Sequence, residues 1–221
     1  MSEQLTINLQ GQQVTLLHDK ALYWESHRLL LVSDLHLGKA GHFRKNGIPV
    51  SAQIHYGDLD RLSQILRQFK CDQVVFLGDL FNSDYNSEWS DFVSWTQIYP
   101  DVQFTLVKGN HDILNPVIYR DCKMEVVDEL RIKPFLLTHI EQRDEDWYNI
   151  SGHVHPCVRM RGPGKQGVRL PVFYFSKDAG LMPAFGNFTG SHAIRPKLTD
   201  RVYGIIGNSV KNLDQYKPVP Q

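Results

Sequence analysis

Cysteine is scarce in this chain, and the cysteines present form no recognisable motif. Cys71, Cys122 and Cys157 are scattered, odd in number and include no Cys-x-x-Cys pair. Neither a disulfide framework nor a zinc knuckle is therefore indicated, because both need paired cysteines at suitable spacing. Free thiols fit a reducing compartment, so we expect the protein in the cytoplasm.

Long apolar runs and an excess of one charge are missing as well. No run approaches the roughly 20 apolar residues of a membrane span, and the first residues lack the basic and apolar segments of a signal peptide. We therefore expect no membrane association. Lys plus Arg equals Asp plus Glu at 24 each, so the formal net charge is zero. This balance predicts no global electrostatic attraction to nucleic acid, although a local basic patch would suffice.

The first half of the chain alternates apolar runs with helical periodicity. Strands are expected within residues 5–32, ending in the apolar run 29–32, and then at 73–77 and 102–107. Apolar residues at helical spacing predict a helix over 58–70, and Ser87 is a candidate cap for a second helix that Pro100 stops. This order is typical of a doubly wound α/β arrangement.

The second half consists mainly of short β-like runs separated by glycine and proline. They lie at 125–127, 134–137, 148–150, 158–160, 172–175 and 202–206. No long linker or internal repeat divides the chain, so we expect one domain over residues 1–221 with two sheets. The polar, proline-containing end predicts a frayed tail from about residue 212.

Histidine is abundant, with ten copies, and one of them stands in the most informative tetrapeptide of the chain. Gly109-Asn110-His111-Asp112 directly follows the apolar run 102–107. Ligands gather at the carboxyl ends of strands in open α/β sheets. An amide oxygen, an imidazole and a carboxylate are the groups that metal-assisted hydrolysis needs. Taken alone, the tetrapeptide could equally be a loop with an Asx-turn.

Similar polar groups follow four other apolar runs. These residues are Asp34 and His36, Asp79, His139, and the pair His153 and His155. A folded sheet would bring these strand ends to one edge, and the excess of nitrogen and oxygen ligands suits two metal ions. Each piece also has a simpler interpretation, such as a turn cap, a satisfied core histidine or a loop with incidental histidines. The ordered set as a whole favours the metal site.

The motifs of this chain, in their order, resemble those of the calcineurin-like metallophosphoesterases. They are Asp-x-His, Gly-Asp, Gly-Asn-His-Asp, a later His after a strand, and Gly-His-x-His. The resemblance implies a four-layer α/β/β/α sandwich with a dinuclear metal centre. It places Asp34, His36 and His155 on one metal, Asn110, His139 and His153 on the other, and Asp79 on both. Manganese is expected, with iron and zinc as alternatives. The chain departs from the family at Ile140, where relatives often have Gly.

Other residues near these motifs are candidates for catalysis and substrate binding. His111 adjoins a ligand but is spare, so it is the candidate general acid, and Asp112 would orient its ring. Lys39, His42 and Arg44 could hold a phosphate or a nucleic-acid backbone, as could Arg159 and Arg161, or they could be solvated surface. Phe185 and Phe188 could stack on a base, although a core role fits them better.

Details outside the metal motifs resemble the bacterial ligase-associated subgroup. They include Gly38-Lys39, Gly47-Ile48-Pro49 and the run 183–190. This resemblance implies a phosphodiesterase acting on DNA or nucleotides in DNA repair, with a DNA ligase or helicase as an associated protein. The alternatives are a nucleotide-sugar or lipid pyrophosphatase, a phosphomonoesterase, and a non-catalytic scaffold. The chain lacks the apolar insertion expected for acyl chains, and it keeps every ligand, which a scaffold tends to lose.

Overall fold

The computed structural model describes residues 4–38, 53–81, 87–161, 167–187 and 189–214. The first half of the chain forms a seven-stranded sheet in sequence order, from β1 to β7. Its strands are β1 (Leu5–Leu9), β2 (Gln12–Leu16), β3 (Leu22–Trp24), β4 (Leu29–Val32), β5 (Gln73–Leu77), β6 (Gln103–Val107) and β7 (Glu125–Val127). The strands pair antiparallel up to β4, whereas β4 to β7 are parallel.

The second half forms a nine-stranded mixed sheet, and its main order is β14-β11-β12-β13-β10-β9-β8. Its strands are β8 (Leu130–Ile132), β9 (Phe135–Thr138), β10 (Tyr148–Ser151), β11 (Pro156–Arg161), β12 (Gly167–Phe175), β13 (Ala179–Leu181), β14 (His192–Ala193), β15 (Arg201–Ile206) and β16 (Ser209–Asn212). The strand β15 pairs with β12 and β16. The sequence therefore predicted both sheets but missed the short strands β8, β13, β14 and β16.

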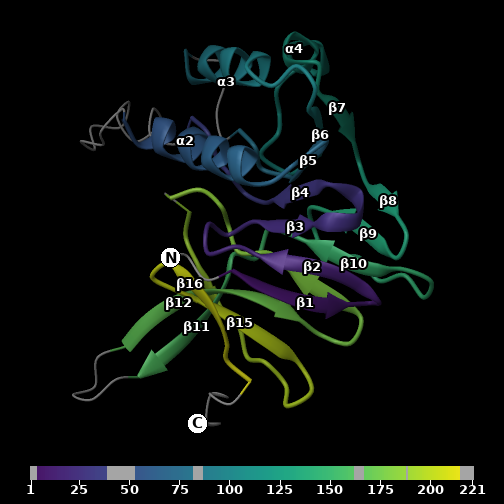
Figure 1. The fold of residues 1–221 in the computed structure, drawn as a ribbon, viewed down its shortest axis with the longest axis vertical. Helices are drawn as coiled ribbons and strands as arrows, with labels where there is room; N and C mark the ends of the chain where they lie inside the picture. Colours follow the sequence, from purple (N-terminus) through teal and green to yellow (C-terminus); the bar gives the residue numbers. More distant parts are fainter. Residues whose placement is uncertain (1–3, 39–52, 82–86, 162–166, 188, 215–221) are drawn as a thin grey trace.

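The helices are α2 (Gln53–Gln68), α3 (Ser87–Gln97) and α4 (Pro116–Tyr119), and single 3₁₀ turns cover Glu25–His27 and Arg120–Cys122. Both predicted helices are present. The helices lie on the outer face of the first sheet, and the second sheet lies on its other face (Figure 1). None of the helices in the described ranges is long and apolar enough to cross a membrane.

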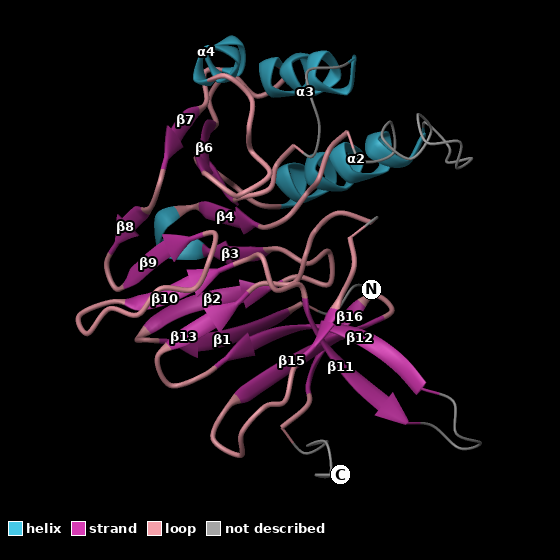
Figure 2. Ribbon diagram, turned by 180° about the vertical axis from the view of Figure 1, so that it is seen from behind, coloured by secondary structure: helices cyan, strands magenta, loops and turns pink. Residues whose placement is uncertain are grey.

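Two large apolar clusters hold these layers together. In one, Leu62 of α2 and Trp89 and Phe92 of α3 pack on Phe76 of the first sheet. In the other, side chains of both sheets meet, as Trp24 and Phe135 do with ring centroids 4.8 Å apart. Because strands of both halves share this second cluster, the two sheets stack face to face, as viewed from behind in Figure 2.

The predicted two mixed sheets with flanking helices are confirmed, but the fourth layer differs from the expectation. In the described part of the chain, no helix covers the outer face of the second sheet (Figures 1 and 2). A small apolar cluster on β11, β12 and β15, which includes Val158, Val172 and Val202, is instead closed by Leu213. The Val202 N–H also donates to Asp214, so a contact with the sheet occurs two residues past the predicted start of the tail.

Candidate metal centre

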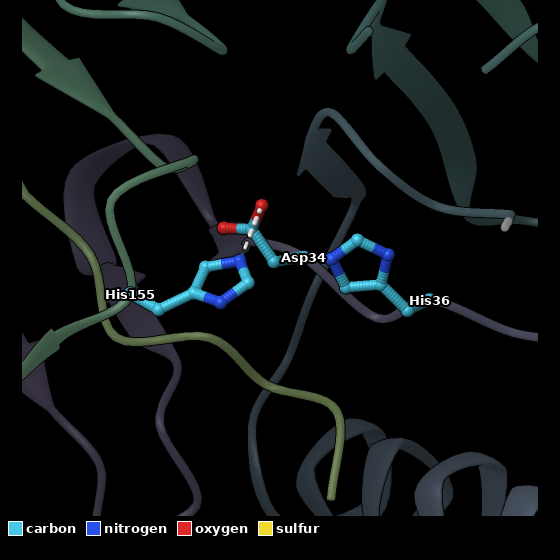
Figure 3. A group of neighbouring side chains, drawn as sticks. All are labelled: Asp34, His36 and His155. Atoms are coloured by element: carbon cyan, nitrogen blue, oxygen red, sulfur yellow. Dashed lines mark ion pairs between the residues drawn. The ribbon is translucent and has the colours of Figure 1, made fainter. Parts of the chain in front are cut away.

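The predicted ligands come together in two groups at the carboxyl ends of the strands. Asp34, His36 and His155 form one group, and their ligand atoms lie within 4.8 Å of one another. Figure 3 shows these three side chains converging from the loop after β4 and the residue before β11. Within this group, His155 Nε2 lies 3.2 Å from Asp34 Oδ1.

The second group consists of Asp79, His139 and His153, again with ligand atoms within 4.8 Å. Asn110 joins this group, because its Oδ1 lies 3.0 Å from His139 Nε2. The carboxylate of Asp79 lies between the groups: one oxygen is 3.4 Å from His139 Nε2 and the other 3.7 Å from His36 Nε2. This position suits the bridging role that the family resemblance implies.

The chemistry of the second group fits a cation. His139 Nδ1 lies 2.9 Å from the Leu77 carbonyl, so this nitrogen carries the proton and Nε2 presents a lone pair. Asn110 Oδ1 and Asp79 Oδ1 are acceptors that lie 3.0 and 3.4 Å from the same Nε2. Three acceptors that converge on one point repel each other unless a positive group lies among them, either a proton, as on His153 Nδ1 at 3.1 Å from the same Nε2, or a metal ion. A divalent metal supplies that charge.

Asp34 is the most enclosed ligand. Burial opposes its ionisation, but hydrogen bonds from His155 and Ser33 and the nearby His139 hold the pKa of its carboxyl below the usual value. The backbone N–H of His153 also donates to both carboxylate oxygens. The group is therefore an anion inside the protein, as a metal ligand must be.

Five of the candidate ligands have an unusual backbone conformation. Positive φ angles between 49° and 64° occur at Asp34, His36, Asp79, His153 and His155. Side-chain-bearing residues rarely adopt this left-handed region, and clusters of such residues mark functional sites. The strand ends therefore turn sharply at the ligands, and the surrounding packing holds these turns.

Comparisons with known proteins assign this geometry to a family. Residues 27–158 match the calcineurin-like phosphoesterase family. The chain belongs to that family. It is therefore a hydrolase that acts on phosphate esters, and its relatives use divalent metals.

Among solved structures, the phosphoesterase resembles the nuclease MPE of Pseudomonas putida. The two share 31% sequence identity and a TM-score of 0.80, and the match covers 96% of this chain and 100% of the nuclease. A protein of unknown function from Aquifex aeolicus, AQ665, matches at 20% identity with a TM-score of 0.42, over 57% of this chain and 78% of the other. A search of curated proteins found no match.

The two predicted catalytic residues, His111 and Asp112, lie in different environments. The exposed ring of His111 stands edge-on to the His36 ring at a centroid distance of 5.6 Å, so it lies at the rim of the metal centre. Asp112 is buried, and its carboxylate accepts hydrogen bonds from the backbone N–H groups of Asp79, Leu80, Phe81 and Gly109. These contacts let Asp112 hold two ligand loops together, whereas the sequence predicted that it orients the His111 ring.

Burial also affects the pKa of the Asp112 carboxyl. Desolvation raises the pKa of its carboxyl, while the backbone hydrogen bonds from Gly109 and Phe81 oppose that rise. The neighbouring carboxylate of Asp79 raises the pKa further. The loops that carry Asp79 and Asn110 therefore share one buried acidic anchor.

Glycine is required where these loops touch. A Cβ on Gly109 would collide with the backbone and carboxylate of Asp79, and a Cβ on Gly152 would collide with Ser33 and Asp34. The glycines of the Gly-Asn-His-Asp and Gly-His-x-His motifs therefore permit the close approach of one ligand loop to another. By contrast, the departure at Ile140 does not disturb the site, because this side chain is exposed.

One structural element of the site was not recognised from sequence. Residues 182–187 and 189–190 belong to a segment that contacts the first ligand loop: the N–H of Phe185 donates to Ser33 O at 2.7 Å, and the N–H of Gly186 donates to Asp34 O at 3.1 Å. The carbonyl of Gly190 lies 3.0 Å from His155 Nδ1, so Nδ1 carries a proton. The other nitrogen, Nε2, faces Asp34, and it would bind a metal through its lone pair once its own proton is lost. The fully buried Phe185 has the predicted core role.

This segment is anchored to α2 by polar contacts between the exposed Asn187 and two residues of the helix, Asp58 and Arg61. Asn187 Nδ2 donates to Asp58 Oδ1 at 2.7 Å, and Arg61 Nη1 donates to Asn187 Oδ1 at 3.1 Å. Arg61 also stacks over the Phe185 ring, with its guanidinium carbon 4.0 Å from the ring centroid. The only sequence signal for this anchor was the unusual 183–190 run itself. Lys39, His42, Arg44 and Phe188 lie outside the described residues.

Proposed function

We propose that this phosphoesterase hydrolyses phosphodiester bonds of nucleic acid or nucleotides with two divalent metal ions. The observation that carries the proposal is the position of Asp79 between two ligand groups, 3.4 Å from His139 on one side and 3.7 Å from His36 on the other. Two cations held there would lower the pKa of water and neutralise the phosphoryl oxygens.

The protein side chains contribute positioning and proton transfer. Asp34, His36 and His155 would hold one ion, and Asn110, His139 and His153 the other. His111 lies beside the centre without belonging to either group, so its ring can donate a proton to the departing alkoxide. The two carboxylates neutralise only half of the four charges of two divalent ions, so the centre attracts an anionic ester.

The similarity to a Pseudomonas putida nuclease over nearly the full length of both chains supports a diester within nucleic acid as the substrate. Manganese is the metal we propose, since oxygen and nitrogen ligands without cysteine suit it. A role in DNA repair, association with a DNA ligase or helicase, and a cytoplasmic location stay predictions. The same holds for phosphate binding by Lys39, His42 and Arg44.

The test is a substrate and metal panel with chelator-treated protein. Manganese, iron or zinc is added back, and hydrolysis is measured for an aryl phosphodiester, an aryl phosphomonoester, a nucleotide sugar, cyclic nucleotides, and single- and double-stranded DNA. We expect manganese to restore hydrolysis of the diesters most strongly. Preference for the monoester or the pyrophosphate would favour those alternative activities, and no hydrolysis with any metal would refute the proposal.

A further inference from the structure

The strands β11 and β12 form a two-stranded ribbon that extends beyond the rest of the second sheet (Figures 1 and 2). Residues 167–171 of β12 pair with β11, whereas residues 172–175 pair with β15. On its other side β11 pairs with β14 only at Pro156 and Cys157. The outer part of the ribbon is therefore held by β11 and β12 alone within the described chain.

The two faces of this ribbon differ in chemistry. Val158 and Met160 on β11 and Leu170 on β12 belong to the small apolar cluster on the outer face of the sheet. Arg159 and Arg169 alternate with these residues, so both lie on the opposite face. That is the face on which Phe173 of β12 packs between the two sheets. The arginines therefore lie on the side of the second sheet that faces the first sheet.

Arg159 and Arg169 are directly opposite each other in the antiparallel register, and both are exposed. Like charges at such a position destabilise a strand pair. Within the described part of the chain, neither guanidinium forms an ion pair with an acidic side chain. The two positive charges thus weaken the ribbon, and an external anion would offset this cost.

The arginine face continues into the metal centre. Arg169 Nη1 donates to the Ser191 carbonyl at 3.3 Å. Ser191 follows Gly190, whose carbonyl contacts the ring of the ligand His155, and His155 itself directly precedes β11. A chain of phosphates leaving the metal centre along β11 would therefore meet the opposed pair Arg159 and Arg169.

The distribution of charge along the sequence agrees with this placement. Residues 147–199 contain seven Lys or Arg and a single acidic residue, Asp178, although the whole chain is balanced. The ribbon lies within this basic stretch. Its exposed Arg159 and Arg169 give this neutral protein local positive charge, which attraction of a polyanion requires.

We propose that Arg159 and Arg169 bind successive phosphates of a nucleic-acid strand whose scissile phosphodiester lies at the metal centre. This proposal rests on the proposed diesterase function and adds a strand-binding surface to it. Phosphate contacts of this kind fix the register of the strand without reading its sequence. The ribbon therefore favours long substrates over small diesters, and it serves DNA and RNA alike because it contacts only phosphates.

The test compares R159A/R169A with R67A/K70A, a control that removes two exposed positive charges outside residues 147–199. Binding of a labelled single-stranded oligonucleotide, as DNA and as RNA, is measured by anisotropy on chelator-treated protein over a range of salt concentrations. We expect R159A/R169A to bind both about tenfold or more weakly than the control, with the slope of log Kd against log salt reduced by about 1.4. R159K/R169K keeps the charges and should recover most of the affinity.

Kinetics with added manganese provide the second readout. For R159A/R169A, the ratio of kcat/KM for the oligonucleotide to kcat/KM for an aryl diester should fall about tenfold or more, mainly through KM. The proposal would be overturned if R159A/R169A and the control bound the oligonucleotide with equal affinity and equal salt slope. It would also be overturned if R159A/R169A lost kcat/KM in the same proportion for the oligonucleotide and the aryl diester. Failure of the wild-type protein to cleave any diester would instead refute the proposed function, while the binding comparison would still test the ribbon.

Discussion

Asp112 fixes the backbone of Asp79: its Oδ2 accepts the Asp79 N–H at 2.8 Å, and the same oxygen accepts the Gly109 N–H at 2.8 Å. One buried carboxylate therefore joins the loop after β5 to the loop after β6. Because Asp79 lies between the two ligand groups, its position depends on a residue that belongs to neither group and that contacts Asp79 through the backbone N–H.

Replacement of Asp112 by Asn should damage both stability and metal binding. An amide can present only one oxygen to the four backbone N–H groups, and its own NH₂ would face donors. We expect a loss of about 3 kcal/mol or more in the free energy of unfolding, measured by urea denaturation. Manganese binding, measured by calorimetry, should weaken as well. An Asp112→Asn protein with normal stability and normal manganese affinity would contradict this role.

Replacement of His111 by Gln should reduce turnover but leave the metals bound. The ring lies at the rim of the centre, so its loss removes a proton donor without removing a ligand. We expect kcat to fall by about a hundredfold or more on an alkyl diester, and by less on an aryl diester whose leaving group needs no proton. Manganese stoichiometry should be unchanged. Equal losses on both diesters would argue against proton donation by His111.

The anchor of the segment 182–190 predicts a long-range effect on the first ligand group. Asn187→Ala removes the side-chain hydrogen bonds to Asp58 and from Arg61, and it loosens the segment whose carbonyl orients His155. We expect a loss of about 1–3 kcal/mol in unfolding free energy. Manganese should bind more weakly at one of two sites, which can be followed by titration with electron paramagnetic resonance. Thr189→Ala, on the same segment, serves as the control and should retain both sites.

The ribbon predicts a conflict between stability and binding. Arg159→Glu would place a carboxylate opposite Arg169 and convert a repulsive pair into an ion pair. We expect a gain of up to about 1 kcal/mol in unfolding free energy together with weaker oligonucleotide binding. Thermal denaturation and anisotropy on the same preparation would measure both. A variant that loses stability and keeps its affinity would show that the pair serves the fold instead.

The cysteines predict low reactivity of the native protein toward alkylating reagents. All three are free thiols, and Cys122 and Cys157 are buried. Burial raises the pKa of the Cys71 thiol to about 12 and that of Cys122 to about 11. At pH 8 these thiols therefore hold their protons and are poor nucleophiles. Mass spectrometry after iodoacetamide treatment should find little modification of Cys71 and Cys122 until denaturant is added.

Much of this architecture was predictable because local patterns carry it. The apolar runs of β4, β5 and β6 and the polar residues that follow each of them predicted both the parallel sheet and the ligands at its edge. Ser87 and Pro100 bounded α3 correctly. The helix α2 begins at Gln53, earlier than the predicted 58, because its first turn lacks the apolar periodicity on which the prediction relied.

The remaining features depend on contacts between distant parts of the chain. Asn187 and Asp58 are 129 residues apart, and no local pattern indicates their hydrogen bond. The register that sets Arg159 opposite Arg169 is fixed only when the sheet forms. Asp112 looked like a partner for its neighbour His111, yet the folded loops offer it four backbone N–H groups, which satisfy a buried carboxylate far better.

The left-handed backbone at five ligands limits how such a centre can evolve. Asp, Asn and His tolerate this conformation better than most other residues, and they are also good metal ligands. Glu, Gln and Cys offer suitable donor atoms but lack this tolerance. Exchange of one ligand type for another is therefore limited at these five positions to Asp, Asn and His.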